Sequence, residues 1–201
     1  MARIGRQIPH FDLVDTAAIQ AVFSSDMLFR YILSMKYMDT LLDSGRTKAA
    51  AVILKNPSAA NQEMADATIR KVETYIYHCL PEVRELHILN IFAFRATEPE
   101  DLNTRFILEG AMAVIGEEND HVIHSTLSLA DYIILAWGNN SGIDSGLYDE
   151  RIFRVKQLIK EFPKQKIFRV CGSRQTKHPL HGLMWGYDYT IEPIGAYIER
   201  E

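Results

Sequence analysis

The sequence predicts a three-layer α/β/α domain built on a central, mainly parallel sheet of four strands. Two observations support this prediction. Four short apolar runs, at 49–54, 86–94, 132–136 and 167–171, are separated by longer stretches in which apolar residues recur every three or four positions. The runs do not alternate between apolar and polar residues, which is typical of strands that helices cover on both faces. No linker or repeat divides residues 1–201, so we expect one domain.

The N-terminal region, residues 1–45, is expected to form a helical segment that packs on this domain. Its central part, from Thr16 to Met38, is rich in aromatic residues that suit packing against the sheet. A break is expected at Ser24-Ser25-Asp26, because these residue types favour the position just before a helix. The first strand, at 49–54, follows this region.

Helices are expected between the strands. The first begins near Asn61 or Glu63 and ends at Pro81, which cannot continue a helix. Two helices, at 102–115 and 118–129, should connect the second strand to the third. One more helix is expected after the third strand, at 148–162. The Tyr- and Ile-rich tail, at 185–198, is expected to add a strand or hairpin.

The composition is that of a globular protein, with 47% hydrophobic and 24% charged residues. The net charge of −4 argues against indiscriminate binding to nucleic acids. No secretory leader is apparent and no apolar run approaches the ~20 residues of a membrane span, so we expect a cytoplasmic protein without a membrane partner. Cys79 and Cys171 lie in apolar segments and suit reduced, buried thiols. The chain is expected to be a monomer or a small homo-oligomer.

Motifs for metals and common cofactors are lacking. His121 and His124, like His178 and His181, have the spacing of paired metal ligands, but no nearby carboxylate or cysteine completes a zinc site. The sequence has no GxGxxG, Walker or Gly-x-Ser-x-Gly motif. We therefore expect neither a metal nor a cofactor.

Polar loops follow all four predicted strands. The carboxyl ends of parallel strands meet at one edge of a sheet, so these loops should line one pocket of the kind that binds small molecules or nucleotides. The loop residues are Asn56, Pro57 and Ser58 after the first strand, Asn90, Arg95 and Thr97 at the second, Trp137 and Gly138 after the third, and His178 and Pro179 after the fourth.

Individual residues of these loops leave alternatives open. The carboxamide of Asn56 can hold a water molecule but cannot remove a proton at neutral pH, and alone its Asn-Pro pair is more typical of an ordinary turn. His178 is either structural or a donor to the anion that forms on a leaving group. Arg95 needs an acidic partner or an anionic ligand. Asp66 and Arg70, four residues apart, form either a helix-surface ion pair or part of the pocket frame.

Five cations lie close together near the C-terminus with no acidic residue between them: Lys164, Lys166, Arg169, Arg174 and Lys177. Such a run is commonly a solvated face. The alternative is an anion-binding surface, which would lie beside the loop at His178, where the run ends.

A series of short motifs occurs in order along the chain: Ala21-Val22-Phe23-Ser24, Arg30-Tyr31, Asn56-Pro57-Ser58-Ala59, Asp66-Ala67-Thr68-Ile69-Arg70, the segment from Asn90 to Thr97, Gly116-Glu117-Glu118-Asn119-Asp120, Ala136-Trp137-Gly138 and His178-Pro179-Leu180. This series resembles a bacterial family, domain-of-unknown-function family 1643, over roughly residues 20 to 183. The resemblance is specific for the family and implies no activity.

The order of the loops also resembles, more distantly, the uracil-DNA glycosylase superfamily. In its mismatch-specific and thymine-specific branches the Asn of an Asn-Pro loop positions the hydrolytic water, and Asn56 matches that Asn. In the uracil-specific branch a His-Pro loop supplies an imidazole and holds the DNA backbone, and His178-Pro179 matches its start. Trp137-Gly138 resembles the segment that leaves the third strand. The sequence lacks the Gly-Gln-Asp-Pro-Tyr loop of uracil specificity and departs from the superfamily's loops at Lys55, Ser58 and Leu180.

The resemblance implies an N-glycosidase that excises an ordinary or modified base from DNA or a nucleotide, as in DNA repair or phage defence. Asn56 would position the water and His178 would stabilise the departing base. Trp137 or Phe92 would stack on the base, and Arg95 or the five-cation run would hold phosphate. The expected substrate contacts are Pro57, Ser58, Asp66, Arg70, Asn90, Phe92, Arg95, Thr97, Asn119, Asp120, Trp137, Gly138, Arg174, Lys177 and Pro179. The alternatives are a non-catalytic protein that binds a nucleotide or modified base, and a small-metabolite hydrolase, which the acidic net charge favours.

Overall fold

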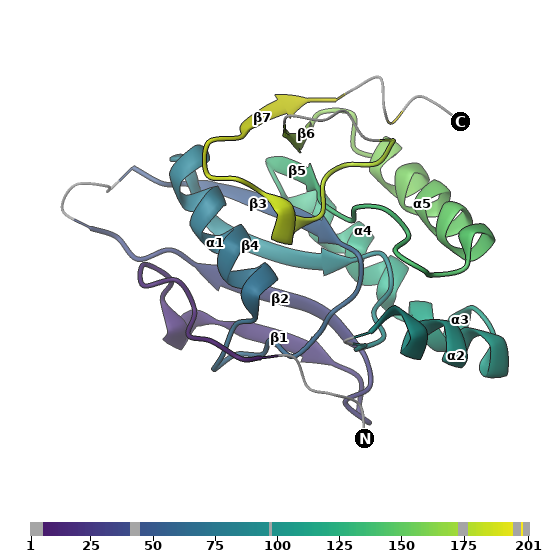
Figure 1. Ribbon diagram of the computed structural model, residues 1–201. Helices are drawn as coiled ribbons and strands as arrows, with labels where there is room; N and C mark the ends of the chain where they lie inside the picture. Colours follow the sequence, from purple (N-terminus) through teal and green to yellow (C-terminus); the bar gives the residue numbers. More distant parts are fainter. Residues whose placement is uncertain (1–5, 41–44, 97, 173–176, 195–197, 199–201) are drawn as a thin grey trace.

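The computed structural model describes residues 6–40, 45–96, 98–172, 177–194 and 198. They form a mixed α/β fold around one sheet of seven strands in the order β1-β2-β4-β3-β5-β6-β7 (Figure 1). The strands are β1 (Gln20–Phe23), β2 (Arg30–Lys36), β3 (Lys48–Leu54), β4 (Val83–Asn90), β5 (Tyr132–Leu135), β6 (Lys166–Cys171) and β7 (Thr190–Pro193).

The sheet is larger than the predicted sheet of four strands, and it is mixed. The four predicted strands correspond to β3, β4, β5 and β6, which are parallel neighbours at its centre. The additional strands, β1, β2 and β7, run antiparallel at the two sides. The strand expected in the C-terminal tail is β7.

The N-terminal helical prediction is wrong, because β1 and β2 form a hairpin there. In β2, Tyr31, Leu33 and Met35 are buried and the residues between them are only half-buried, which is the two-residue period of a strand. The expected helix cap at Ser24-Ser25-Asp26 instead closes the hairpin, where Asp26 accepts a hydrogen bond from the backbone N–H of Leu28 at 3.0 Å. The region's only described helical element is the short 3-10 turn Thr16–Ala18.

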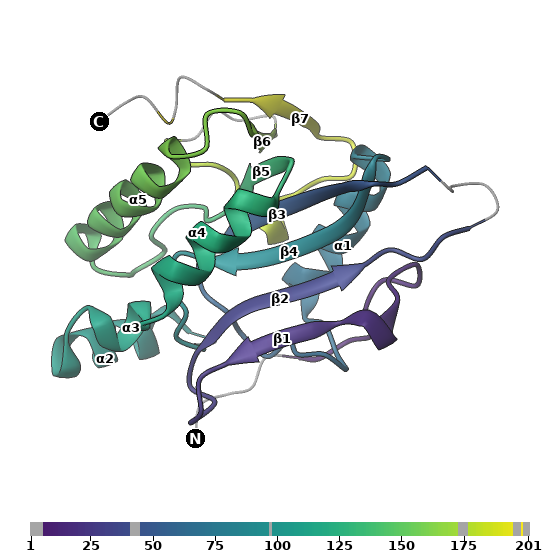
Figure 2. The same ribbon diagram turned by 180° about the vertical axis from the view of Figure 1, so that it is seen from behind.

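Helices cover both faces of the sheet. One face carries α1 (Ala67–Cys79), as Figure 1 shows, and the view from behind in Figure 2 shows α4 (Asn119–Leu129) and α5 (Ser145–Lys160) on the other. Beside α4 lie α2 (Pro99–Glu109) and α3 (Met112–Ile115). The sequence predicts one helix at 102–115 in this region, but Gly110, with φ of 89°, divides it into these two. No described helix combines the length and apolar composition that a membrane crossing requires.

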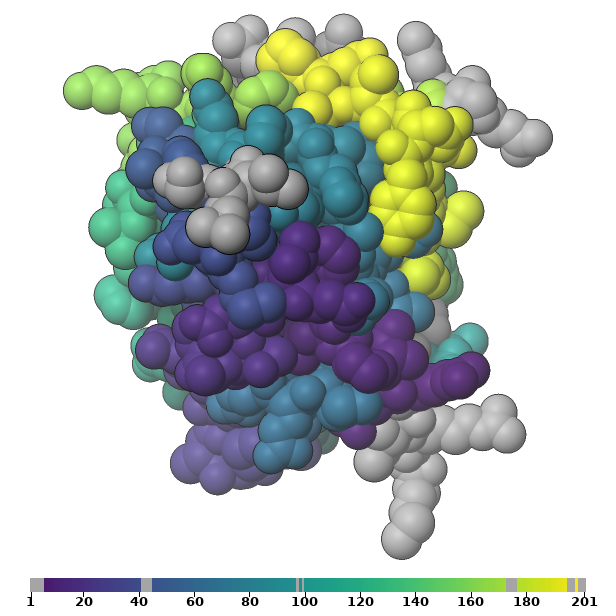
Figure 3. Space-filling model, turned by 90° about the vertical axis from the view of Figure 1, so that its left-hand side faces the viewer, coloured from purple at the N-terminus to yellow at the C-terminus, as the bar shows by residue number. Residues whose placement is uncertain are grey.

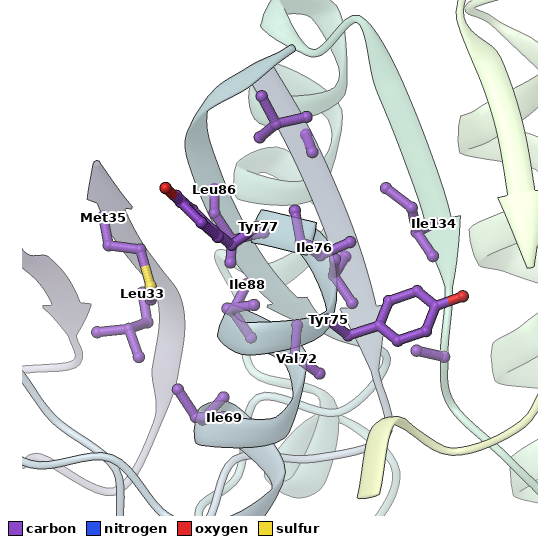
Figure 4. Packing of buried hydrophobic residues seen from close by; sticks show 14 of the residues in the cluster. Leu33, Met35, Ile69, Val72, Tyr75, Ile76, Tyr77, Leu86, Ile88 and Ile134 are labelled. Atoms are coloured by element: carbon purple, nitrogen blue, oxygen red, sulfur yellow. The ribbon is translucent and has the colours of Figure 1, made fainter. Parts of the chain in front are cut away.

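The packing of α1 explains why the sheet needs the hairpin. Ile69, Val72 and Ile76 of α1 are fully buried and face the sheet (Figure 4). Beneath them, Leu33 of β2 pairs in register with Ile88 of β4. Each such side chain contributes roughly 1.5–3 kcal/mol by its burial. Without β2, part of the apolar face of α1 would have no partner.

The N-terminal segment packs along the outside of α1. Figure 3 turns the left-hand side of Figure 1 toward the viewer, and purple N-terminal residues cover much of the surface next to blue and teal residues. The backbone of Ile8 exchanges two hydrogen bonds with Ala65, each 2.8 Å long. The imidazole of His10 lies 2.5 Å from the carboxylate of Glu73 inside α1, and both side chains are fully buried. These contacts fix the start of α1 at the edge where the parallel strands end.

Candidate functional site

A cavity of about 340 Å³ opens at the carboxyl edge of the sheet, between the end of β3 and the first turn of α1. The residues after β3 form one wall, and the loop that carries His181 and Leu183 forms another. This second loop crosses the edge from β6: Gly182 donates to the carbonyl oxygen of Ala136, after β5, at 3.3 Å. The loop after β3 therefore faces His181 and Leu183, which follow the predicted His178-Pro179-Leu180 loop in the chain.

Asn56 lines this cavity with its amide fixed on one side. Nδ2 donates to the carbonyl oxygen of Ala96 at 2.6 Å and to that of Pro57 at 3.3 Å. The backbone N–H of Ala96 in turn donates to Pro57 at 3.1 Å, which ties the loop after β3 to the segment after β4. Because Nδ2 is committed to carbonyl groups, Oδ1 is the atom that can accept a hydrogen bond from a water or a ligand.

Asp66 supplies a carboxylate to the same cavity. It caps α1, since Oδ1 accepts from the backbone N–H groups of Thr68 and Ile69 at 2.9 Å each. Oδ2 accepts a hydrogen bond from the hydroxyl of Ser58. The cap explains why α1 starts at Ala67, several residues later than predicted, whereas Asn61 closes the preceding turn by accepting from Met64 N–H at 2.9 Å.

The predicted ion pair between Asp66 and Arg70 does not form. The Arg70 guanidinium instead donates to the carbonyl oxygens of Pro9 and His10 and lies 3.2 Å from Asp12. Arg70 therefore anchors the N-terminal segment and is not among the residues that line the cavity.

Three cations line the cavity: Arg6, Arg30 and Lys55. Arg30, at the start of β2, is 1% exposed, and its burial lowers its pKa to about 10. Lys55 directly follows β3, is 7% exposed, and has a pKa lowered to about 8 by burial. Its Nζ donates to the hydroxyl of Ser141 at 2.9 Å.

His181 is the imidazole of the cavity. Burial, followed by the charge of Lys55, lowers its pKa to about 4, so the ring is neutral at pH 7. Nδ1 accepts a hydrogen bond from the backbone N–H of Leu183 at 3.3 Å, which leaves the ring proton on Nε2. His181 can therefore donate one hydrogen bond to a ligand without carrying a charge.

His178 is not among the cavity-lining residues. Its ring meets Tyr148 of α5 edge-on, with centroids 5.8 Å apart. Nζ of Lys55 lies 5.8 Å from the centroid of the same tyrosine ring, so His178 is a neighbour of the site across one side chain. Next to it, Pro179 is buried, and Lys177 is exposed with Nζ 3.9 Å from Asp149.

Two aromatic residues expected to stack on a base cannot do so in this structure. Phe92 and Trp137 are both 0% exposed and belong to the hydrophobic core on the α4–α5 side of the sheet. Gly138, by contrast, borders the site. Its φ is 72°, and a Cβ there would lie 2.8 Å from the Cβ of His181.

The predicted polar residues after β4 belong to a buried cluster on the α4–α5 side. Asn119 donates from Nδ2 to the carbonyl oxygens of Asn90 and Ile91, at 3.1 and 3.2 Å. Arg151 donates to the same Ile91 oxygen and pairs with Asp120 at 2.5 Å. Asn119 and Arg151 thus satisfy the backbone where β4 ends, and Asn90, Asn119 and Asp120 do not line the cavity.

Arg95 also faces elsewhere. It lies over the ring of Phe23, 5.1 Å from its centroid, and donates to the carbonyl oxygen of Met27 at 3.2 Å. No acidic residue among those described pairs with Arg95, and Arg95 does not line the cavity. Arg95 therefore braces the hairpin turn. Thr97, also predicted to contact substrate, lies outside the described residues.

The five-cation run does not form one surface. Lys164 and Lys166 lie at the start of β6, at the opposite edge of the sheet from the cavity, whereas Lys177 follows the end of that strand. Arg169 sits within the strand, paired in register with Leu135. Arg174 lies outside the described residues. Of the described members of the run, Lys177 is the one next to His178, so the run as a whole does not form the alternative anion-binding surface there.

Of the residues that line the cavity, Asn56, Ser58 and Asp66 are among those predicted from the sequence, whereas Arg30, Lys55 and His181 are not. A signal exists for Lys55, a charge that directly follows a buried apolar run. Arg30 was hidden by the helical prediction for its segment, and His181 stands three residues after the histidine that the resemblance singled out. No group of three His, Cys, Asp or Glu side chains in the described ranges gathers to hold a metal ion.

Comparison with known proteins identifies a family. Neither the curated proteins nor the solved structures give a match. One family model, described as a protein of unknown function (DUF1643), matches residues 30–180. These residues include the cavity-lining Arg30, Lys55, Asn56 and Asp66. Because the match covers most of the chain, the protein belongs to the DUF1643 family.

Proposed function

We propose that this protein is an N-glycosidase of the uracil-DNA glycosylase type, which hydrolyses the bond between a base and its sugar in DNA or a nucleotide. The observation that carries the proposal is the juxtaposition, in one cavity, of the amide of Asn56, the carboxylate of Asp66 and the neutral imidazole of His181. An amide, an anion and an uncharged donor are the groups that such a hydrolysis needs.

The chemistry assigns one task to each group. Asn56 Oδ1 holds a water molecule whose oxygen bonds to the anomeric carbon as the carbon–nitrogen bond breaks. The electron pair of that bond leaves on the base nitrogen, and His181 Nε2–H stabilises it with a hydrogen bond. The water proton passes to Asp66, the acceptor that a carboxamide cannot provide. His181 thereby takes the role that the resemblance implied for His178.

The order of the loops supports a uracil-DNA-glycosylase-like fold as part of this proposal. The four parallel strands follow one another along the chain in the order of the motifs, and helices lie on both faces of the sheet. A stacking ring must come from elsewhere than Phe92 and Trp137, which are buried. Fold likeness alone would not assign an activity, so the proposal rests on the cavity.

A second candidate is a non-catalytic protein that binds a nucleotide or modified base. Both carboxylate oxygens of Asp66 already accept hydrogen bonds, from the start of α1 and from Ser58. An acceptor so fully engaged suits a rigid binding site as well as it suits catalysis.

Release of free bases distinguishes the two candidates. The protein is incubated with genomic DNA from varied sources, including phage DNA with modified bases, and with free nucleotides, and released bases are identified by mass spectrometry. We expect release by the wild type and a loss of at least ~100-fold in Asn56→Ala and His181→Asn. His121→Asn, an exposed histidine on α4, is the matched control and should keep full activity. Binding without release favours the second candidate, and wild-type rates in both site variants reject the assigned roles.

A further inference from the structure

The charges of the cavity are unbalanced. Arg6, Arg30 and Lys55 line it, and Asp66 is its one carboxylate among the described residues, an excess of two positive charges at neutral pH. His181 adds no charge, since its pKa is about 4. Two of the cations are almost fully buried, and burying a charge is costly unless an opposite charge or hydrogen bonds compensate it.

Arg30 lacks that compensation. Its guanidinium offers five N–H donors, and among the described residues it makes one hydrogen bond, from Nη1 to the carbonyl oxygen of Ala60 at 2.8 Å. Nε is buried without a hydrogen-bond partner. The charge of Asp66 favours the protonated guanidinium, but no hydrogen bond joins the two, and Arg95 adds repulsion. Arg30 lines the cavity, and a guanidinium with unused donors matches the paired oxygens of a phosphate or carboxylate.

Lys55, a second buried cation of the same cavity, also lacks an opposite charge among the described residues. Its ammonium group donates to a neutral partner, the hydroxyl of Ser141, and no described carboxylate pairs with it. Lys55 and Arg30 flank a cavity whose other polar groups include Asn56 and Ser58. An anion between the two cations would supply the charge that each of them lacks.

The burial of Arg30 and Lys55 determines which kind of anion fits the cavity. DNA backbone phosphates run along a protein surface and are contacted by accessible side chains, whereas Arg30 and Lys55 are 1% and 7% exposed. The exposed lysines of the C-terminal run lie at two different edges of the sheet. A cavity of about 340 Å³ suits part of a small molecule, and a phosphate monoester carries the −1.5 to −2 charge that balances the excess.

We propose that the cavity binds a terminal phosphate monoester, so that the substrate is a free nucleoside monophosphate and not an internal residue of a DNA strand. This inference rests on the proposed function for the nucleoside part of the ligand. The phosphate lies between Arg30 and Lys55, and the base and sugar extend toward Asn56 and His181.

Calorimetry tests the inference with four probes: inorganic phosphate, the common nucleoside 5′-monophosphates, the corresponding nucleosides, and a single-stranded oligonucleotide without a terminal phosphate. At least one monophosphate should bind at least about tenfold more tightly than its nucleoside, and phosphate should compete with it. Lys55→Met and Arg30→Lys should each lower the affinity for the monophosphate at least about tenfold. Equal affinity for nucleoside and monophosphate, or tighter binding of the oligonucleotide, would overturn the inference.

Two matched controls separate binding from folding. Lys160→Met changes an exposed lysine at the end of α5, and Arg46→Lys changes a buried arginine that donates to the backbone at the far end of α1. Both should keep the affinity of the wild type, and loss of affinity in either would count against a local phosphate site. Monophosphate binding without base release leaves this inference intact and defeats the glycosidase. Base release from DNA but not from monophosphates would support the glycosidase and overturn the monophosphate inference.

Discussion

At the residue scale, Gly138 leaves the space that His181 occupies, because glycine has no side chain. Its φ of 72° is a conformation that other residues adopt at a cost of about 1–2 kcal/mol, and a Cβ would lie 2.8 Å from the Cβ of His181. Gly138→Ala should therefore displace His181 and lower base release or ligand affinity at least about tenfold. Gly110→Ala is the control, because Gly110 has a φ of 89° but no atom within 4 Å of its added Cβ. Urea unfolding should show similar backbone strain in both variants, and equal activity in both would contradict the role of Gly138.

Two histidines, the buried His10 and the half-buried His181, respond to pH in opposite directions. The unfolded chain protonates His181 near pH 6.5, but the folded protein does so only near pH 4, so stability is present above pH 6.5 and falls as the pH drops toward 4. This loss is about 3 kcal/mol at most. Burial lowers the pKa of His10, but the hydrogen bond and charge of Glu73 outweigh it and raise the pKa overall. The stabilisation from protonated His10 is therefore complete below pH 6.5 and is lost as the pH rises through its folded pKa.

Unfolding in urea at several pH values measures both effects. His181→Asn should lose less stability than the wild type between pH 6.5 and 4, and His10→Asn should lose less as the pH rises above 6.5. His121→Asn, on the surface of α4, should follow the wild-type curve throughout. A wild-type pH profile in His181→Asn would show that this imidazole does not stay neutral in the fold.

At the scale of elements, Asp66 serves both α1 and the cavity, and substitutions separate the two tasks. Asp66→Asn keeps an oxygen that accepts from Thr68 and Ile69 N–H, so the free energy of unfolding should change little, while activity should fall at least ~100-fold. Asp66→Ala should also lose about 1 kcal/mol of stability. Asp144 caps α5 through Leu147 N–H at 2.9 Å, and Asp144→Asn should leave activity unchanged. Full activity in Asp66→Asn would remove the carboxylate from the mechanism.

The central elements could be predicted from the sequence because their signal is local. After Lys48, strand β3 is the continuous apolar run 49–54, whose last five residues are buried. The hairpin of β1 and β2 could not, since its aromatic residues also suit a helix and only the pairing of Leu33 with Ile88 settles the period. The site divides in the same way: Asn56 follows a recognisable strand, whereas His181 reaches the cavity through a loop that crosses two strands.

At the scale of the whole molecule, the fold keeps a positive cavity at one edge of a sheet whose chain is negative overall, with a net charge of −4. A ligand that binds only the folded state adds RT ln(1 + [L]/Kd) to its stability, about 2.7 kcal/mol at a hundredfold excess over Kd. Phosphate should therefore raise the melting temperature of the wild type, while a chloride buffer of equal ionic strength without phosphate or sulfate should not.

Two variants show where phosphate binds when it raises the melting temperature. Lys55→Met should lose most of the phosphate-dependent rise in melting temperature, because one of the two buried cations is gone. The double variant Lys164→Met/Lys166→Met removes two exposed cations at the start of β6, the opposite edge, and should keep the full rise. An equal rise in all three proteins would mean that phosphate acts through general charge screening. A rise lost only in the double variant would place the anion at the amino edge of the sheet.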